Sequence, residues 1–159
     1  MVKKKTLYVA HRLTNAPLDF LMVLKALKTL LEKDYEILHF LGVNQGTAGD
    51  VYERDIIECV ASADLVVGIC DQESNGLGYE VGARVERYQK PMLTLAHNDT
   101  KLTRLLIGSA DRNPHCHFLR RYDDLLRQVP GFIYEVLQIV DNQIDQNLPL
   151  FPETEAVAV

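Results

Sequence analysis

The chain has 159 residues and a formal net charge of −5, with 47% hydrophobic and 25% charged residues. This length suits one domain that can bury a core without a metal or a disulfide, and the composition excludes a wholly disordered chain. Its lysines and arginines form no basic stripe, so we expect no polymeric nucleic acid as a partner, whereas a short anionic ligand stays compatible.

The first half of the chain alternates short apolar runs with amphipathic ones. Residues 6–10 predict a buried strand, and residues 15–17 open a helix whose apolar positions recur every three or four residues. Residues 36–41 predict a second strand, followed by a polar loop. Asp50 and Glu53 have the spacing of a capping box, which predicts that the second helix begins there.

The second half continues the alternation, with strands expected at residues 65–70, 91–96 and 115–119. A glycine-rich turn at residues 71–78 leads into a helix, and Asp99 is expected to cap a short one. Asp123 starts a final helix to about residue 145, with a predicted break at Pro130. Strands and helices that alternate over these lengths predict an α/β domain, with helices on both faces of a parallel sheet.

We expect residues 1–148 to form a single domain and residues 149–159 to form an acidic C-terminal tail. Cys59, Cys70 and Cys116 are odd in number and lack metal-ligand spacing, so they are predicted to be buried apolar residues in a reducing compartment. No signal peptide or membrane span is recognisable, and the predicted location is the cytoplasm, with no membrane partner.

The turn after the central strand carries the richest set of functional groups. Gly76 and Gly78 allow a ligand to approach the backbone closely, and the free N–H groups of the following helix suit an anion. We place Glu80 in the first helical turn, where the helix dipole favours its ionised form. An ionised carboxylate beside a sugar can attack the anomeric carbon. On spacing alone, an ion pair between Glu80 and Arg84 is the stronger interpretation.

Two sequence blocks in this region match the pattern of a known family. Residues 63–67 place Ala-Asp ahead of an apolar strand, and residues 74–82 run from a polar turn into Gly-x-Gly-x-Glu-x-Gly. This resembles the nucleoside 2-deoxyribosyltransferase superfamily, which includes the 2′-deoxynucleoside 5′-phosphate N-hydrolases. The resemblance covers about residues 51–111. It implies a flavodoxin-like three-layer sandwich with a five-stranded parallel sheet, needing no metal or organic cofactor. It also implies a homodimer or higher homo-oligomer whose subunits share the site.

The resemblance assigns roles to individual residues. Glu80 matches the nucleophile, and Asp55 resembles the carboxylate that assists the leaving base, although it lies one residue further from Asp64 than the pattern expects. Ser74 matches the contact to the 5′ end of the sugar, and Thr103 a hydroxyl supplied by a neighbouring subunit. The full substrate-binding set that we predict is Tyr8, His11, Arg12, Asp71, Ser74, Gly76, Gly78 and Thr103.

Several of these residues keep a structural alternative. Arg12 stands where the family has a small residue, and it either reaches a phosphate or carboxylate or is solvated. Asp71 and Glu73 are either acids at the mouth of the site or solvated turn residues. Asp64 is better explained as a cap of the preceding turn. His115 and His117 share a strand face but are too few for a metal site.

The predicted function is hydrolysis of the N-glycosidic bond of a (deoxy)nucleoside 5′-monophosphate through a covalent glycosyl-Glu80 intermediate. The alternatives are a 2-deoxyribosyltransferase that exchanges bases and a non-catalytic module that binds a nucleotide. An NAD-cleaving enzyme of similar topology is a further possibility. A cytokinin-type phosphoribohydrolase ranks last, because its Pro-Gly-Gly-x-Gly-Thr turn is missing from the sequence.

Overall fold

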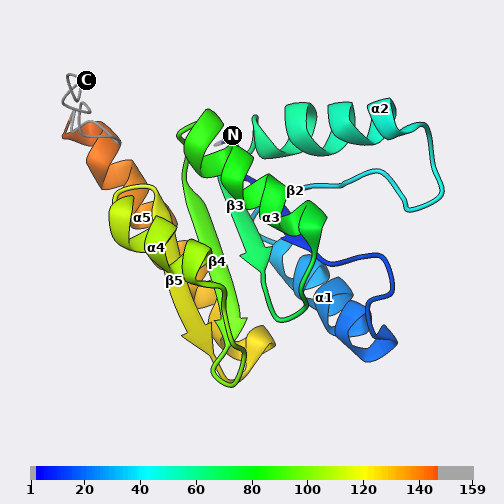
Figure 1. Ribbon diagram of the computed structural model, residues 1–159. Coiled ribbons are helices and arrows are strands. Elements are labelled where there is room, and N and C mark those ends of the chain that lie inside the picture. Colours follow the sequence, from blue (N-terminus) through cyan, green and yellow to red (C-terminus); the bar gives the residue numbers. More distant parts are fainter. Residues whose placement is uncertain (1–2, 147–159) are drawn as a thin grey trace, which may run out of the picture.

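The computed structural model describes residues 3–146, so the predicted acidic tail lies outside the described residues (Figure 1). Five strands form one parallel sheet in the order β2-β1-β3-β4-β5. They are β1 (Thr6–His11), β2 (Glu36–Leu38), β3 (Leu65–Ile69), β4 (Met92–His97) and β5 (His117–Tyr122). This strand order is that of flavodoxin-like folds, and the predicted fold class is confirmed.

Helices cover both faces of the sheet and make it the middle of three layers (Figure 1). Two of them, α1 (Leu18–Leu31) and α5 (Leu125–Asp145), pack on one face. The other face carries α2 (Ala48–Tyr52), α3 (Asn75–Gly82) and α4 (Arg104–Arg112). The α2 helix continues as the π-helical segment η1 (Glu53–Val60), and α3 continues as the π-helical segment η2 (Ala83–Arg87). Within the described residues, no helix combines the length and the apolar character that a membrane span requires.

The two faces of β1 separate the two halves of the core. Leu7 and Val9 point into the cluster under α1 and α5, whereas Tyr8 and Ala10 point into the cluster under η1 and α3. Successive side chains of a strand alternate between faces, so both faces of this inner strand must be apolar or hydrogen-bonded. Tyr8 is therefore a polar group directed from the middle of the sheet toward the α3 side.

Helix starts differ from the prediction at two places. The capping box of α2 is formed by Thr47 and Asp50, three residues earlier than the predicted pair, with Asp50 Oδ2 accepting from the Thr47 N–H at 2.7 Å. The short fourth helix is capped by Thr103 rather than by Asp99. In both cases a threonine hydroxyl accepts the free N–H of the third helical residue. Asp50 is itself that third residue in α2, and Asp99 lies four residues before the cap of α4.

The predicted break in the last helix is wrong. The α5 helix starts after Asp124 and runs without interruption through Pro130 to Asp145. Proline removes one backbone hydrogen bond near the helix start. The neighbouring Val129 and Ile133 are fully buried against the sheet, and this packing keeps the segment helical across the proline.

Candidate active site

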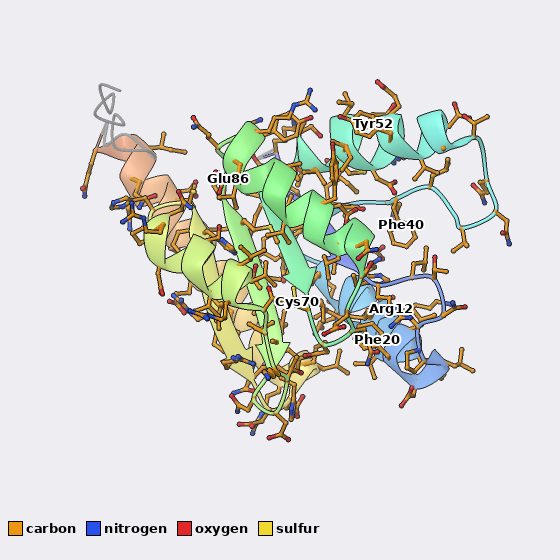
Figure 2. The ribbon with its side chains drawn as sticks, viewed as in Figure 1. Arg12, Phe20, Phe40, Tyr52, Cys70 and Glu86 are labelled. Atoms are coloured by element: carbon orange, nitrogen blue, oxygen red, sulfur yellow. The ribbon has the colours of Figure 1, made fainter. Side chains whose placement is uncertain are left out.

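A cavity of about 500 Å³ opens at the carboxyl end of β1, beside β3. This is the point where strand order reverses, and ligands of open parallel sheets bind at such a point. The walls come from β1, from the connection between β2 and α2, and from the helices α2, η1 and α3. Figure 2 shows Phe40 on that connection and Tyr52 on α2. The polar and aromatic lining residues are Tyr8, His11, Thr14, Phe40, Tyr52, Asp55, Ser74, Tyr79 and Glu80.

Glu80 is the acid at the centre of this lining. Tyr8 Oη donates to its Oε1 at 2.7 Å, across 72 residues of sequence. Burial raises the pKa of Glu80 to about 7; the Tyr8 hydrogen bond opposes the rise, as does the more distant charge of Lys28, while Asp55 adds to it. The same burial and the Glu80 charge raise the pKa of Tyr8. The hydroxyl therefore stays protonated and remains a donor.

The position of Glu80 in its helix differs from the prediction. Ser74 is the N-cap of α3, so Glu80 is the sixth helical residue and lies in the second turn. The influence of the helix dipole falls off within the first turn. Burial thus outweighs the dipole, and the carboxylate is not held ionised as the sequence suggested.

The predicted ion pair of Glu80 with Arg84 is wrong as well. Arg84 is fully buried and donates to the carbonyl oxygens of Pro91 (2.9 Å), Val60 (2.7 Å) and Ala63 (2.8 Å). Its guanidinium fixes the ends of η1 and η2 instead of neutralising an acid. Glu80 is left facing the cavity.

Asp55 lines the same cavity from η1, and its Oδ1 accepts from the backbone N–H of Leu41 at 3.0 Å. Burial raises its pKa, and Glu80 is one of the groups on which its charge acts. Asp55 belongs to the π-helical segment η1, whose turns hold more residues than α-helical turns. Although its spacing to Asp64 differs from the expected pattern, Asp55 lies in the lining of the cavity.

The first loop contributes His11 but not Arg12. Of the two, only His11 is a lining residue, and its Nδ1 lies 2.8 Å from the Arg12 carbonyl oxygen. Burial and the charge of Lys28 lower the pKa of His11 to about 4. Arg12 instead donates from Nε to the carbonyl oxygen of Thr14, a residue that does line the cavity, at 2.9 Å.

Only part of the glycine-rich turn lines the cavity. Ser74 and Gly76 are lining residues, and Ser74 Oγ accepts from the N–H of Leu77 at 3.3 Å as the N-cap of α3. Gly78 is exposed and lies outside the lining, and a Cβ atom there would meet nothing within 4 Å. The close approach expected of the two glycines is therefore restricted to Gly76.

Asp71 and Thr103 lie away from this cavity. Asp71 accepts from the His97 N–H at 2.6 Å and from Thr100 Oγ1 at 2.9 Å, and it also accepts from the Tyr122 hydroxyl. These bonds join the ends of β3, β4 and β5, which is a structural role. Thr103 is the exposed N-cap of α4. Its contact to a ligand of a neighbouring subunit stays a prediction.

Two other residues, Asp64 and His117, also have structural roles. Asp64 Oδ2 accepts from the Thr6 N–H at 2.7 Å and thus ties β1 to the start of β3. His117 is a buried histidine bonded to Thr94 and Ser109. In the described part of the chain, no three His, Cys, Asp or Glu side chains are grouped to hold a metal ion.

Sequence reasoning predicted Tyr8 but missed Lys28 and the other aromatic residues of the cavity, Phe40, Tyr52 and Tyr79. Lys28 belongs to α1 on the other face of the sheet, and its Nζ lies 3.1 Å from His11 Nε2 and 4.5 Å from the centre of the Phe40 ring. Tyr52 and Tyr79 stand 6.4 Å apart, centre to centre, at the mouth between α2 and α3. Exposed tyrosines on helices were the available signal, whereas nothing in the spacing marked Lys28.

No known protein family and no curated protein matches the sequence. Among solved structures, the CMP N-glycosidase BcmB of Clostridium botulinum is similar, with a TM-score of 0.60 and 14% sequence identity. The match covers 82% of this chain and 99% of that chain. At this identity the likeness shows a shared fold, and the whole of the neighbour's length is represented in it.

Proposed function

We propose that the protein hydrolyses the N-glycosidic bond of a (deoxy)nucleoside 5′-monophosphate and belongs to the nucleoside 2-deoxyribosyltransferase superfamily. The observation that carries the proposal is Glu80: a carboxylate at the switch point of the sheet, anchored through one oxygen by Tyr8 and facing Asp55 across the cavity. The shared fold with a CMP N-glycosidase supports the same reaction class.

In this reaction Glu80 Oε2 attacks C1′ of the sugar while Tyr8 holds Oε1. The bond between C1′ and the base nitrogen breaks, and its electron pair leaves with the base. Asp55 donates a proton to the departing base, a role that its raised pKa favours. A glycosyl ester on Glu80 results. Water then attacks C1′, loses its proton to the Asp55 carboxylate, and releases the sugar phosphate and Glu80.

The phosphate is placed at the start of α3. The first backbone N–H groups of a helix have no partners within the helix and point toward an anion. Ser74 and Gly76, at the start of α3, line the cavity, as does Thr14 of the loop after β1. Arg12 lies outside the lining and is held through its Nε by the Thr14 carbonyl oxygen, so the backbone N–H groups of α3 are the donors assigned to the phosphate.

Incubation with a panel of nucleosides and their 5′-monophosphates, followed by chromatography of the free bases, tests the proposal. We expect release of base from monophosphates by the wild-type protein and loss of at least 10³-fold in Glu80→Gln, as for removal of a covalent nucleophile. Glu86→Gln, an exposed carboxylate further along the same helical segment (labelled in Figure 2), is the matched control.

The other possible outcomes of this assay distinguish the proposed function from its alternatives. Undiminished release in Glu80→Gln would remove the mechanism, and equal turnover of nucleosides and monophosphates would remove the phosphate site. Exchange of labelled base into the substrate would identify a transferase. Tight binding that leaves every ligand intact for hours would identify a binding module, and NAD is included in the panel for the NAD-cleaving alternative.

A further inference from the structure

The charged side chains that line the cavity are both acidic. Within the described residues, the lining set contains Asp55 and Glu80 but neither lysine nor arginine. Lys28 is the cation behind this wall: it starts from α1, on the opposite face of the sheet, and its ammonium reaches past the end of β1 to the ring of His11. A half-buried ammonium ordinarily requires a hydrogen-bond acceptor or an anion.

The hydrogen bonds fix the protonation state of His11. A carbonyl oxygen can only accept, so the His11 Nδ1 that lies 2.8 Å from the Arg12 carbonyl must carry a proton. In the neutral ring Nε2 then holds a lone pair, and Lys28 Nζ donates to it at 3.1 Å. Protonation of Nε2 would place two donors and two positive charges face to face. His11 is therefore a neutral wall residue and not an acid or base.

Phe40 completes the cluster. Its ring meets His11 edge-on with centres 5.6 Å apart, and Lys28 Nζ lies 4.5 Å from its centre. Phe20 of α1 packs against the other side of His11, with centres 6.2 Å apart. The ammonium thus contacts two of the cavity walls, one from β1 and one from the connection after β2. Both are held to α1 by a cation that the ligand itself need not touch.

We infer that Lys28 is a positioning residue of this site: it fixes the His11 and Phe40 walls and holds a positive charge against the cavity in which Glu80 lies. The effect of that charge on catalysis rests on the proposed function of Glu80. A cation placed behind the wall favours the ionised nucleophile without facing C1′, where positive charge develops as the base leaves. The Lys28 ammonium adds a positive charge next to the cavity, whose charged lining residues are both acidic.

The charged groups around Glu80 set the direction in which its pKa is expected to move when Lys28 is replaced. Glu80 is faced by Tyr8 from β1, by Asp55 and Cys59 from η1, and by Lys28 from α1. Of these, Lys28 is the one cation, and its removal leaves Asp55 unopposed. Burial lowers the pKa of Lys28 to about 8, with Glu80 opposing the fall, so the ammonium is present at neutral pH and is lost above it.

Three variants of α1 test the inference. Lys28→Met keeps the length of the side chain without its charge, Lys28→Arg keeps a permanent charge, and Lys25→Met is the exposed control on the same helix. NMR of the ring carbons of His11 and of the side-chain carboxyl carbon of Glu80, recorded against pH without any substrate, follows both groups. In Lys28→Met we expect both titrations to move up, that of His11 by about one pH unit.

Activity provides the second measurement. For base release, we expect the acid limb of the kcat/KM profile to rise in Lys28→Met, with about a threefold loss at pH 6. Lys28→Arg should restore the acid limb, because a guanidinium keeps the positive charge that favours ionised Glu80. A role limited to packing would change neither limb. Lys25→Met should follow the wild type throughout.

The outcomes separate this inference from the proposed function. Unchanged His11 and Glu80 titrations in folded Lys28→Met overturn the inference even if base is released. Absence of base release with shifted titrations overturns the proposed function alone. If Lys28→Met does not fold, the wild-type protein still decides: a His11 ring protonated at Nε2 at pH 6, seen in the two-bond ¹H–¹⁵N spectrum, overturns the inference.

Discussion

Replacing Glu80 by glutamine is expected to stabilise the folded protein, and to do so most at alkaline pH. The pKa of Glu80 is raised from 4.5 to about 7, with burial as the largest cause. The folded state thus binds this proton more tightly than the unfolded state, so the associated stability is present below pH 4.5 and is lost as the pH rises through 7. Glutamine carries no charge and keeps an oxygen that accepts from Tyr8.

The size of the effect follows from the same two values. At about 1.4 kcal/mol for each pH unit, the difference between the folded and unfolded pKa of Glu80 lowers the free energy of unfolding by about 3 kcal/mol at pH 8 and by about 1 kcal/mol at pH 5, relative to low pH. Urea unfolding followed by circular dichroism, at both pH values, measures the difference between wild type and Glu80→Gln. The exposed Glu86→Gln serves as control. A stability gain that is equal at pH 5 and pH 8 would refute the burial argument.

Three further changes test other parts of the structure. Tyr8→Phe removes the hydrogen bond that lowers the pKa of Glu80; the acid limb of base release should move up by about one pH unit, with about a tenfold loss of kcat/KM at pH 6 that disappears near pH 9. Arg84→Met leaves four carbonyl oxygens without the guanidinium that donates to them and should lower the free energy of unfolding by at least about 3 kcal/mol in urea titrations. Asp71→Asn should lower it by about 1–3 kcal/mol while KM for the substrate stays unchanged, and a raised KM would return Asp71 to the binding site.

The fold could be predicted because it depends on local patterns. The five apolar runs became five strands, and the fully buried β3 was recognisable as a central parallel strand by apolar residues on both faces. Boundaries were less predictable where tertiary contacts decide them. β2 ends at Leu38, so Phe40 leaves the sheet and becomes a cavity wall, and Pro130 remains inside a helix because its neighbours are buried.

The location of Glu80 at the cavity could also be predicted, but not its environment. Its position after a glycine-rich turn placed it at the carboxyl edge of the sheet. Its pKa depends on Tyr8 and Asp55, which are 72 and 25 residues away in the sequence, and on Lys28 from the opposite face. No spacing rule connects these residues. The spacing of Asp55 likewise left its direction open in the sequence, because the direction depends on the π-helical geometry of η1.

The hydrogen-bond partners of Arg84 help to explain why Glu80 is buried without a cation beside it. A structural acid in a helix is most simply stabilised by a cation four residues on, and this chain has one in Arg84. The guanidinium instead binds backbone carbonyl oxygens outside its helix, and Glu80 is buried with Tyr8 as its hydrogen-bond partner and Asp55 as a repulsive neighbour. That arrangement lowers the stability of the fold at neutral pH. A carboxyl group buried at this cost in the lining of a cavity is better explained by its chemistry than by its packing.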